Sequence, residues 1–279
     1  MATLRVPLVG NEGMRTVAIA GLGAIGLPVA QALDRGMEGL RLVAVSARDR
    51  TRAAAAVADF AHVPAVVDLP VLAEADIVLE AAPAAVFEDV ALPAIIAGRV
   101  LVACSAGALL PRMHLIEEAR RTGARVVVPT GALLGLDAVR AAAEGPVASV
   151  TIETRKPPGG LEGAPYLVQR GLALGGLAAP LLVFEGNALD AAAGFPANVN
   201  VAAALALAGI GPERTRVEIW ADPGVTRNTH TVRVDSDAAR LTMLVENVPS
   251  EANPRTGKLT ALSVLACLRG LSSTLRVGS

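Results

Sequence analysis

The chain has 279 residues, of which 53% are hydrophobic and 2% aromatic, and its formal net charge is −1 at pH 7. This length allows one large or two modest domains, and the near-neutral charge argues against a nucleic-acid partner. Cys104 and Cys267 fit no disulfide framework or metal site. No apolar stretch is long enough to span a bilayer, and residues 1–14 lack the apolar core of a signal peptide. We therefore expect a soluble, cytoplasmic protein without a metal, in which residues 1–14 form a loose extension before the first strand.

The first half of the chain alternates between short apolar runs and helical segments. Strands are predicted over residues 16–20, 40–46, 76–81, 100–104 and 125–128, and helices over 27–33, 50–60, 86–97 and 111–122. Continuous apolar strands joined by helices favour a parallel sheet that is covered on both faces. Residues 1–130 are thus predicted to form a doubly wound α/β domain.

A glycine-rich turn of sequence G-x-G-x-x-G joins the first predicted strand to the first helix. Gly21 permits a tight turn, Gly23 lets a pyrophosphate approach the backbone, and Gly26 lets helix and strand pack closely. The helix N-terminus, with the backbone of Ala24 and Ile25, attracts phosphates. The alternative is a glycine-rich turn without a ligand, but the flanking strand and helix favour a Rossmann-type domain that binds NAD or NADP.

The end of the second predicted strand bears on the choice between the two dinucleotides. An acidic residue there typically binds the ribose 2′-hydroxyl of NAD. Asp49 stands slightly late for that role, whereas Ser46 and Arg48 stand where a 2′-phosphate is accepted. The alternative for Arg48 is a solvated surface charge, so NAD and NADP both stay open.

Beyond residue 130 the strands alternate between apolar and polar residues, which is typical of half-exposed strands. Strands are predicted over residues 149–156, 216–221, 228–234 and 240–246, the last three as an antiparallel meander, and helices over 136–143, 199–208 and 257–270. We expect residues 131–250 to form an inserted α+β substrate domain with a mainly antiparallel sheet. Residues 251–279 are expected to return to the first domain as a helix that buries positions 259, 262, 265 and 266. The active site is expected between the two domains.

Two polar residues fall on predicted apolar strand faces. His230 shares a face with Val232 and Val234, and Lys156 ends the inward row of strand 149–156. A histidine is a natural general acid–base near neutral pH, and a cation in a cleft can hold a substrate carboxylate. The alternatives are a hydrogen-bonded core histidine and a snorkelling lysine.

Other candidates stand at strand ends and at one helix start. Ser105 and its small neighbours let a nicotinamide ring lie against the backbone, or else form a simple tight turn. Cys104 is interpreted as a buried strand-end cysteine rather than a nucleophile, because no basic residue adjoins it in sequence. Asn198 and Asn200 stand at the start of a predicted helix, where one is expected to cap the helix and the other to bind a carboxamide or carboxylate.

Six short motifs are spread over residues 15–270. They are GLGAIG at 21–26, CSAGA at 104–108, FPANVNVAA at 195–203, ADPGVTRNTH at 221–230, ENVPS at 246–250 and NPRTG at 253–257. Together these motifs resemble the L-aspartate dehydrogenase family.

The resemblance implies NAD(P)-dependent oxidative deamination of L-aspartate to iminoaspartate, which water converts to oxaloacetate and ammonia, and which can feed nicotinamide cofactor biosynthesis. The family's catalytic histidine falls on His230, and its cofactor contacts fall on Ala132 and Asn200. The hydride leaves the α-carbon only when the amine is neutral, so a base is needed. Lys156 and Asn198 are then the candidates that hold the substrate carboxylates.

Two other interpretations stay open. One is another reductase, of the dihydrodipicolinate-reductase or homoserine-dehydrogenase type, and the other is a non-catalytic dinucleotide-sensing module. For the L-aspartate dehydrogenase interpretation we expect a homodimer that uses the outer face of the second sheet, with no membrane or nucleic-acid partner.

Overall fold

The computed structural model describes residues 13–251, 253 and 256–278. The predicted loose extension therefore lies, over residues 1–12, outside the described residues. The chain divides into two compact units. Unit 1 takes its described residues from Met1–Ser105, Arg112–Pro129 and Ala261–Val277, and unit 2 from Ala106–Pro111, Thr130–Thr260 and Gly278–Ser279. The short segment Ala106–Pro111 thus belongs to unit 2, although unit 1 flanks it in sequence.

Unit 1 is built on a six-stranded parallel sheet with the order β3-β2-β1-β4-β5-β6. The strands are β1 (Arg15–Ala20), β2 (Leu40–Ser46), β3 (Ala65–Val66), β4 (Ile77–Glu80), β5 (Val100–Ala103) and β6 (Arg125–Val127). The strand order reverses beside β1, as in a Rossmann-type sheet, which confirms the predicted doubly wound fold. The two-residue strand β3 was not predicted because it is too short to show a pattern.

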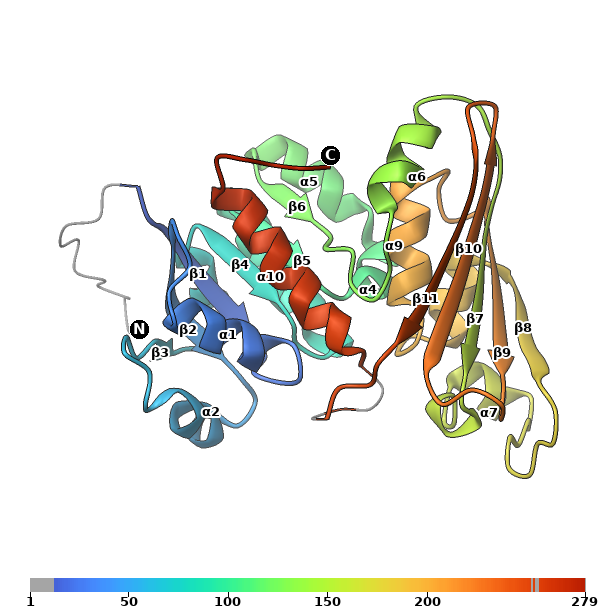
Figure 1. The fold of residues 1–279 in the computed structure, drawn as a ribbon. Coiled ribbons are helices and arrows are strands. Elements are labelled where there is room, and N and C mark those ends of the chain that lie inside the picture. Colours follow the sequence, from blue (N-terminus) through green and yellow to red (C-terminus); the bar gives the residue numbers. More distant parts are fainter. Residues whose placement is uncertain (1–12, 252, 254–255, 279) are drawn as a thin grey trace. The chain divides into compact units, whose positions relative to one another are not determined.

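Helices cover both faces of this sheet. They are α1 (Gly26–Asp34), α2 (Arg50–Val57), α3 (Phe87–Ile96), α5 (His114–Thr122) and most of α10 (Lys258–Ser272), with 3₁₀ turns at Leu69–Glu74, Ala84–Val86 and Leu110–Arg112. Residues of α1 and α10 share one apolar core with alternate residues of β1, β2, β4 and β5, and both helices lie on the same face of the sheet (Figure 1). Helix α5 ends at Gly123, whose φ of +76° is the left-handed conformation that favours glycine.

Helix α10 turns a different side to the core from the one predicted. Val264 and Leu268 are fully buried, whereas Leu262 is 58% exposed. Leu265 and Leu271 pack only partly against the core. The predicted face was wrong because apolar residues occupy most of the circumference of this helix, so their spacing selects no single side.

Unit 2 is built on a five-stranded sheet with the order β11-β10-β7-β9-β8. The strands are β7 (Val147–Lys156), β8 (Leu181–Asn187), β9 (Thr215–Ala221), β10 (Asn228–Ser236) and β11 (Arg240–Asn247). The pairing is antiparallel except between β7 and β9. The mainly antiparallel sheet is confirmed, but the predicted meander was wrong, because β7 lies between β9 and β10. Four residues of β7 are buried, and the strand pairs with β10 along one edge and with β9 along the other.

Short helices pack on the inner face of this sheet. They are α6 (Leu136–Ala143), α8 (Ala188–Gly194) and α9 (Asn200–Ala208), with α4 (Ala106–Leu109), α7 (Pro165–Gln169) and a 3₁₀ turn at Pro158–Gly160 nearby in unit 2. Figure 1 shows α6 and α9 on one face of the sheet. Helix α9 is rich in alanine, and its central residues, 202–206, are buried, so small side chains let it approach the strands closely. Among the described residues, no helix has the length and apolarity to cross a bilayer.

Candidate functional site

The glycine turn after β1 has the geometry of a dinucleotide cradle. A Cβ atom on Gly21 would lie 2.5 Å from the carbonyl oxygen of Ala81, and one on Gly26 would collide with the carbonyl oxygen of Gly21. These two glycines are therefore required by the packing of unit 1 itself. A Cβ atom on Gly23 would meet nothing within 4 Å, so the fold does not need a glycine there. The open space beside Gly23 fits a pyrophosphate that must approach the backbone closely.

The start of helix α1 also fits a bound phosphate. Ile25 stands at the N-cap, no side chain bonds there, and the first turn holds no acidic residue. The N-terminal N–H groups and the positive end of the helix dipole are thus not neutralised by the described side chains. An anion is their natural partner, and Ala24 and Ile25 supply the backbone around it.

Asp49 lies three residues beyond the end of β2, at the N-cap of helix α2. Its carboxylate caps helix α2 by accepting the N–H of Arg52 at 2.9 Å. The backbone carbonyl of Ser46 accepts the N–H of Gly21 at 2.7 Å, which ties the glycine turn to β2. Arg48 is exposed beside this strand end.

Glu80, at the carboxyl end of β4, is a buried acid that was not among the predicted site residues. It is fully buried, and its carboxylate accepts the Ser105 N–H at 2.9 Å and the Ser105 hydroxyl at 3.0 Å. Burial raises the pKa of Glu80 to about 7, although the hydrogen bonds from Ser105 act in the opposite direction. In the sequence, Glu80 ends the apolar run DIVLE, and an acidic residue in that place is the feature that could have indicated a buried carboxylate.

Cys104 lies beside this acid in unit 1. Burial and the Glu80 charge raise the pKa of the Cys104 thiol well above its usual range, so the thiol form persists at neutral pH. A thiolate is needed for nucleophilic attack. Cys104 is partly buried, and its raised pKa agrees with the interpretation of a structural cysteine rather than a nucleophile.

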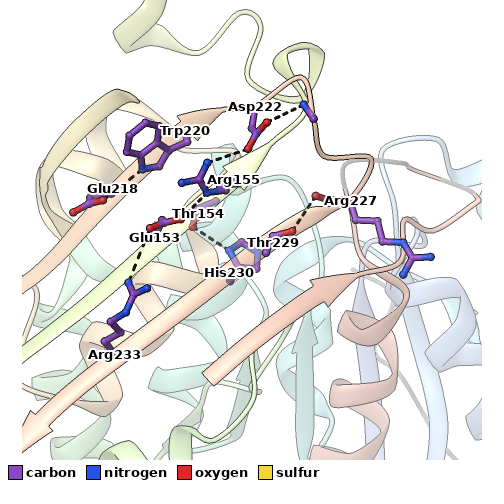
Figure 2. Close-up of polar contacts among 11 residues, drawn as sticks. Glu153, Thr154, Arg155, Glu218, Trp220, Asp222, Arg227, Thr229, His230 and Arg233 are labelled. Atoms are coloured by element: carbon purple, nitrogen blue, oxygen red, sulfur yellow. Dashed lines mark hydrogen bonds and ion pairs between the residues drawn. The ribbon is translucent and has the colours of Figure 1, made fainter. Parts of the chain in front are cut away.

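His230 lies on the inner face of unit 2's sheet, where the alternation of β10 predicts it. It is 3% exposed, and its Nδ1 atom lies 3.0 Å from the hydroxyl oxygen of Thr154, its register partner on β7. Figure 2 shows the imidazole and this hydroxyl pointing toward one another. Burial, followed by the charge of Lys156, lowers the pKa of His230 to about 3. The imidazole is therefore neutral at neutral pH and keeps a lone pair.

Lys156 lies two residues beyond Thr154 on the same face of β7, and it is 6% exposed. Its Nζ atom donates a 2.7 Å hydrogen bond to Oδ1 of Asn198. The structure therefore brings together two predicted substrate residues from distant parts of the sequence. A buried cation with an oriented amide beside it is an arrangement that suits a carboxylate ligand.

Neither asparagine caps helix α9, so that expectation was wrong. Val199 holds the N-cap position without a side-chain bond. The amide oxygen of Asn198 is taken by Lys156, and that of Asn200 accepts the N–H of Gly107 at 3.0 Å. Each oxygen thus serves a tertiary contact within unit 2, which capping would have prevented.

Ala132, a predicted cofactor contact, lies in a loop that Asn247 holds. The Asn247 side chain is buried and donates from Nδ2 to the carbonyl oxygen of Ala132 at 3.0 Å. Asn247 was not predicted, although it belongs to the ENVPS motif at 246–250. Among the predicted contacts, Ala132 and Asn200 belong to unit 2, whereas the glycine turn, Arg48 and Ser105 belong to unit 1.

The outer face of β7 anchors the turn that leads toward His230. Arg155 donates from Nη1 to Asp222 at 3.0 Å and lies over the ring of Trp220 (Figure 2). Asp222 also accepts the N–H of Gly224 at 2.8 Å, while its own N–H is bonded to the Lys156 carbonyl oxygen. The ADP turn is thus fixed to the end of β7. A hollow of about 280 Å³ lies just beyond, lined by Gly224, Val225, Thr226, Arg227, Thr229 and Glu246.

The described part of the chain contains no group of three or more His, Cys, Asp or Glu side chains that could hold a metal ion. His62 and His114 are exposed, which leaves His230 as the one buried histidine, since the sequence contains three. The groups available for acid–base chemistry on the inner sheet face of unit 2 are therefore His230 and Lys156, with Thr154 as their polar neighbour.

Comparison with family models divides the chain into two matched regions. Residues 21–129 match the model described as homoserine dehydrogenase, NAD binding domain. Residues 137–271 match the model described as aspartate dehydrogenase, C-terminal. The first match covers the glycine turn and the second covers Lys156, Asn198 and His230.

Named relatives and a solved structure extend this likeness to almost the whole chain. The chain is 54% identical to L-aspartate dehydrogenase 3 of Bordetella bronchiseptica, covering 94% of this chain and 97% of that protein. It is 52% identical to L-aspartate dehydrogenase of Bradyrhizobium diazoefficiens, covering 94% of each. The crystal structure of aspartate dehydrogenase from Thermotoga maritima is similar with a TM-score of 0.72 at 27% identity, covering 95% of this chain and 99% of that one. The chain therefore belongs to the L-aspartate dehydrogenase family.

Proposed function

We propose that this protein oxidatively deaminates L-aspartate with NAD or NADP, forming iminoaspartate that water converts to oxaloacetate and ammonia. The observation that carries the proposal is the pair of buried groups on one sheet face, a lysine and an imidazole that is neutral at neutral pH. Aspartate brings two carboxylates and a protonated amine, so it needs both a cation and a base. The printed names of relatives that are 54% and 52% identical support the same substrate.

The dinucleotide is held, in this proposal, by the glycine turn of unit 1. Gly21, Gly23 and Gly26 cradle the pyrophosphate with the backbone of Ala24 and Ile25, and Arg48 approaches the ribose. Ser105, Ala132 and Asn200 contribute nearer the nicotinamide. When bound, the nicotinamide accepts the hydride from the aspartate α-carbon.

His230 acts as the base. The amine of free aspartate is protonated at neutral pH, and a C=N bond forms only after the nitrogen has lost a proton and regained its lone pair. A neutral imidazole can take that proton, and such acid–base help is typically worth about 10²–10⁴ in rate. After that proton has passed to solvent, the neutral imidazole can accept a proton from the water that attacks the imine.

Lys156 and Asn198 hold a substrate carboxylate. Asn198 fixes the lysine ammonium through its 2.7 Å hydrogen bond, which reduces the entropy that the lysine loses on binding. Burial is the main cause of the lowered pKa of His230 and the Lys156 charge is the second, and the carboxylate offsets this second contribution. Substrate binding therefore makes the imidazole a stronger base at the moment when a proton must be removed.

We also propose a cytoplasmic homodimer whose product can feed nicotinamide cofactor biosynthesis. The free cysteines, Cys104 and Cys267, support a reducing compartment. Leu244, on the edge strand β11, is 61% exposed, and it supports a contact between copies through the outer sheet face. Multi-angle light scattering of the protein and of its Leu244→Glu variant tests the dimer, which the substitution should weaken.

A spectrophotometric assay of aspartate with each of NAD and NADP tests the proposed activity. Reduced dinucleotide should appear with aspartate and not with homoserine or alanine, and dihydrodipicolinate, which a reductase would reduce, is tested separately for consumption of reduced dinucleotide. Turnover of homoserine or dihydrodipicolinate in place of aspartate would overturn the proposal. Dinucleotide binding without any turnover would favour a sensing module.

A further inference from the structure

Thr154 contacts His230, the residue proposed as the base, and this contact bears on which ring nitrogen can take a proton. The two residues are register partners on the central strand β7 and its neighbour β10, and both side chains are buried. The Thr154 hydroxyl oxygen lies 3.0 Å from Nδ1 of His230. Because one ring nitrogen is engaged by Thr154, Nε2 is the nitrogen that is left for a substrate.

The position of the ring proton decides whether Nε2 can act. A neutral imidazole carries one proton, and the nitrogen without it is the base. If Nδ1 carries the proton and donates a hydrogen bond to the Thr154 oxygen, Nε2 keeps its lone pair. If the hydroxyl donates to Nδ1 instead, Nε2 carries the proton and cannot accept another.

We propose that Thr154 is a positioning residue for His230: the Thr154 hydroxyl oxygen accepts a hydrogen bond from Nδ1–H, which keeps the ring proton on Nδ1 and leaves the lone pair on Nε2. The inference rests on the proposed function, in which Nε2 takes one proton from the substrate ammonium and no other bond to the imidazole forms or breaks. In the resulting imidazolium, both nitrogens carry protons, and the Thr154 oxygen continues to accept the one on Nδ1.

The choice of a hydroxyl has a consequence for the charge of the ring. A carboxylate at this position would stabilise the imidazolium strongly and raise the pKa of the histidine. A threonine hydroxyl orients the ring without adding a negative charge. The charge of Lys156 acts on His230 and favours the neutral ring. Glu153 and Arg155 alternate with Thr154 along β7, and their side chains lie on its opposite face.

Nitrogen NMR of the ligand-free protein labelled with ¹⁵N-histidine tests the proton's position directly. The chain has three histidines, so variants of His62 and His114 assign the His230 signals. At pH 8, Nε2 of His230 should show the shift of an unprotonated nitrogen and Nδ1 that of a protonated one. A protonated Nε2 in the unaltered protein would overturn the proposal, whatever the substrate is.

Substitutions separate a positioning role from a packing role. Thr154→Val keeps the shape and removes the acceptor, so it should change the tautomer and lower kcat with aspartate by about 10–100-fold, the range seen when the partner that orients a metal-ligating histidine is removed. The KM for aspartate should change little. Thr154→Ser keeps the hydroxyl and should restore both the tautomer and most of kcat.

Thr151→Val on the same strand is the matched control, because Thr151 lies on the opposite face of β7. It should leave the tautomer and kcat unchanged. Melting temperatures and circular dichroism of all variants show whether they fold. A Thr154→Val protein that folds and keeps the tautomer of the unaltered protein contradicts the positioning role. If NMR agrees and aspartate is not turned over, the proposed substrate is wrong and the role of Thr154 stands.

Discussion

Lys156 donates a 2.7 Å hydrogen bond from Nζ to Oδ1 of Asn198, which joins the end of β7 to the segment before α9. The Lys156→Met substitution removes the charge and keeps most of the volume. We expect KM for aspartate to rise by at least about tenfold, equivalent to about 1.4 kcal/mol, because a carboxylate loses its cation. Steady-state kinetics with aspartate and alanine measures the effect. An equal rise in KM for both substrates would argue against a contact with the side-chain carboxylate.

His230→Gln tests the base. Glutamine occupies a similar place but cannot take a proton at neutral pH, so aspartate turnover should fall by at least about a hundredfold. Titration with the reduced dinucleotide, followed by fluorescence, should give an almost unchanged dissociation constant. His114→Gln, at an exposed helical position, is the control and should keep full activity. Unchanged turnover in the His230 variant would remove the assignment.

The same histidine should make the fold sensitive to acid. The pKa of His230 is about 3 in the folded protein and is ordinarily 6.5. Between about pH 6.5 and pH 3, His230 therefore binds a proton in the unfolded chain and stays neutral in the folded protein. The free energy of unfolding should therefore fall as the pH drops from 6.5 toward 3. Urea denaturation at several pH values, compared between the unaltered protein and His230→Gln, isolates this contribution. Parallel curves for the two proteins would show that His230 is not the source.

Glu80 should act in the opposite sense. Its pKa is about 7 in the folded protein against an ordinary 4.5, so the folded state retains a proton that the unfolded state releases. The free energy of unfolding should fall as the pH rises from about 4.5 to 7 and stay level above that. In Glu80→Gln the fall should be absent, because the amide does not titrate. The difference between the two proteins, measured by urea denaturation, should reach its final value near pH 7, and a difference that does not vary with pH would contradict the buried acid.

Alanine substitutions at Gly23 and Gly26 should have different effects on stability and on NADH binding. Gly23→Ala places a methyl group in open space, so the melting temperature should hold while the dissociation constant for NADH rises by about tenfold or more, because the methyl blocks the approach of the pyrophosphate. Gly26→Ala places the methyl group against the Gly21 carbonyl oxygen and should lower the melting temperature. Calorimetry and fluorescence titration separate these results. Unchanged NADH affinity in Gly23→Ala would exclude the cradle.

The sequence alone determined the parts of this protein that depend on local patterns. The bounds of β2 and α6 were predicted to the residue, because apolar runs and periodicity are local properties. The alternation of β7 and β10 turned Lys156 and His230 inward, since successive side chains of a strand point to opposite faces. The glycine spacing indicated the cradle because the strand, the glycine turn and the helix follow one another directly in the sequence.

The tertiary structure alone decided which of these elements meet. The place of β7 between β9 and β10 depends on burial of a whole sheet face, which no turn sequence encodes. The bonds that join Glu80 to Ser105, Asn198 to Lys156 and Thr154 to His230 link residues 25, 42 and 76 positions apart. Buried polar groups must find partners wherever the folded chain supplies them, so these pairs follow from packing and leave no periodic signal in the sequence.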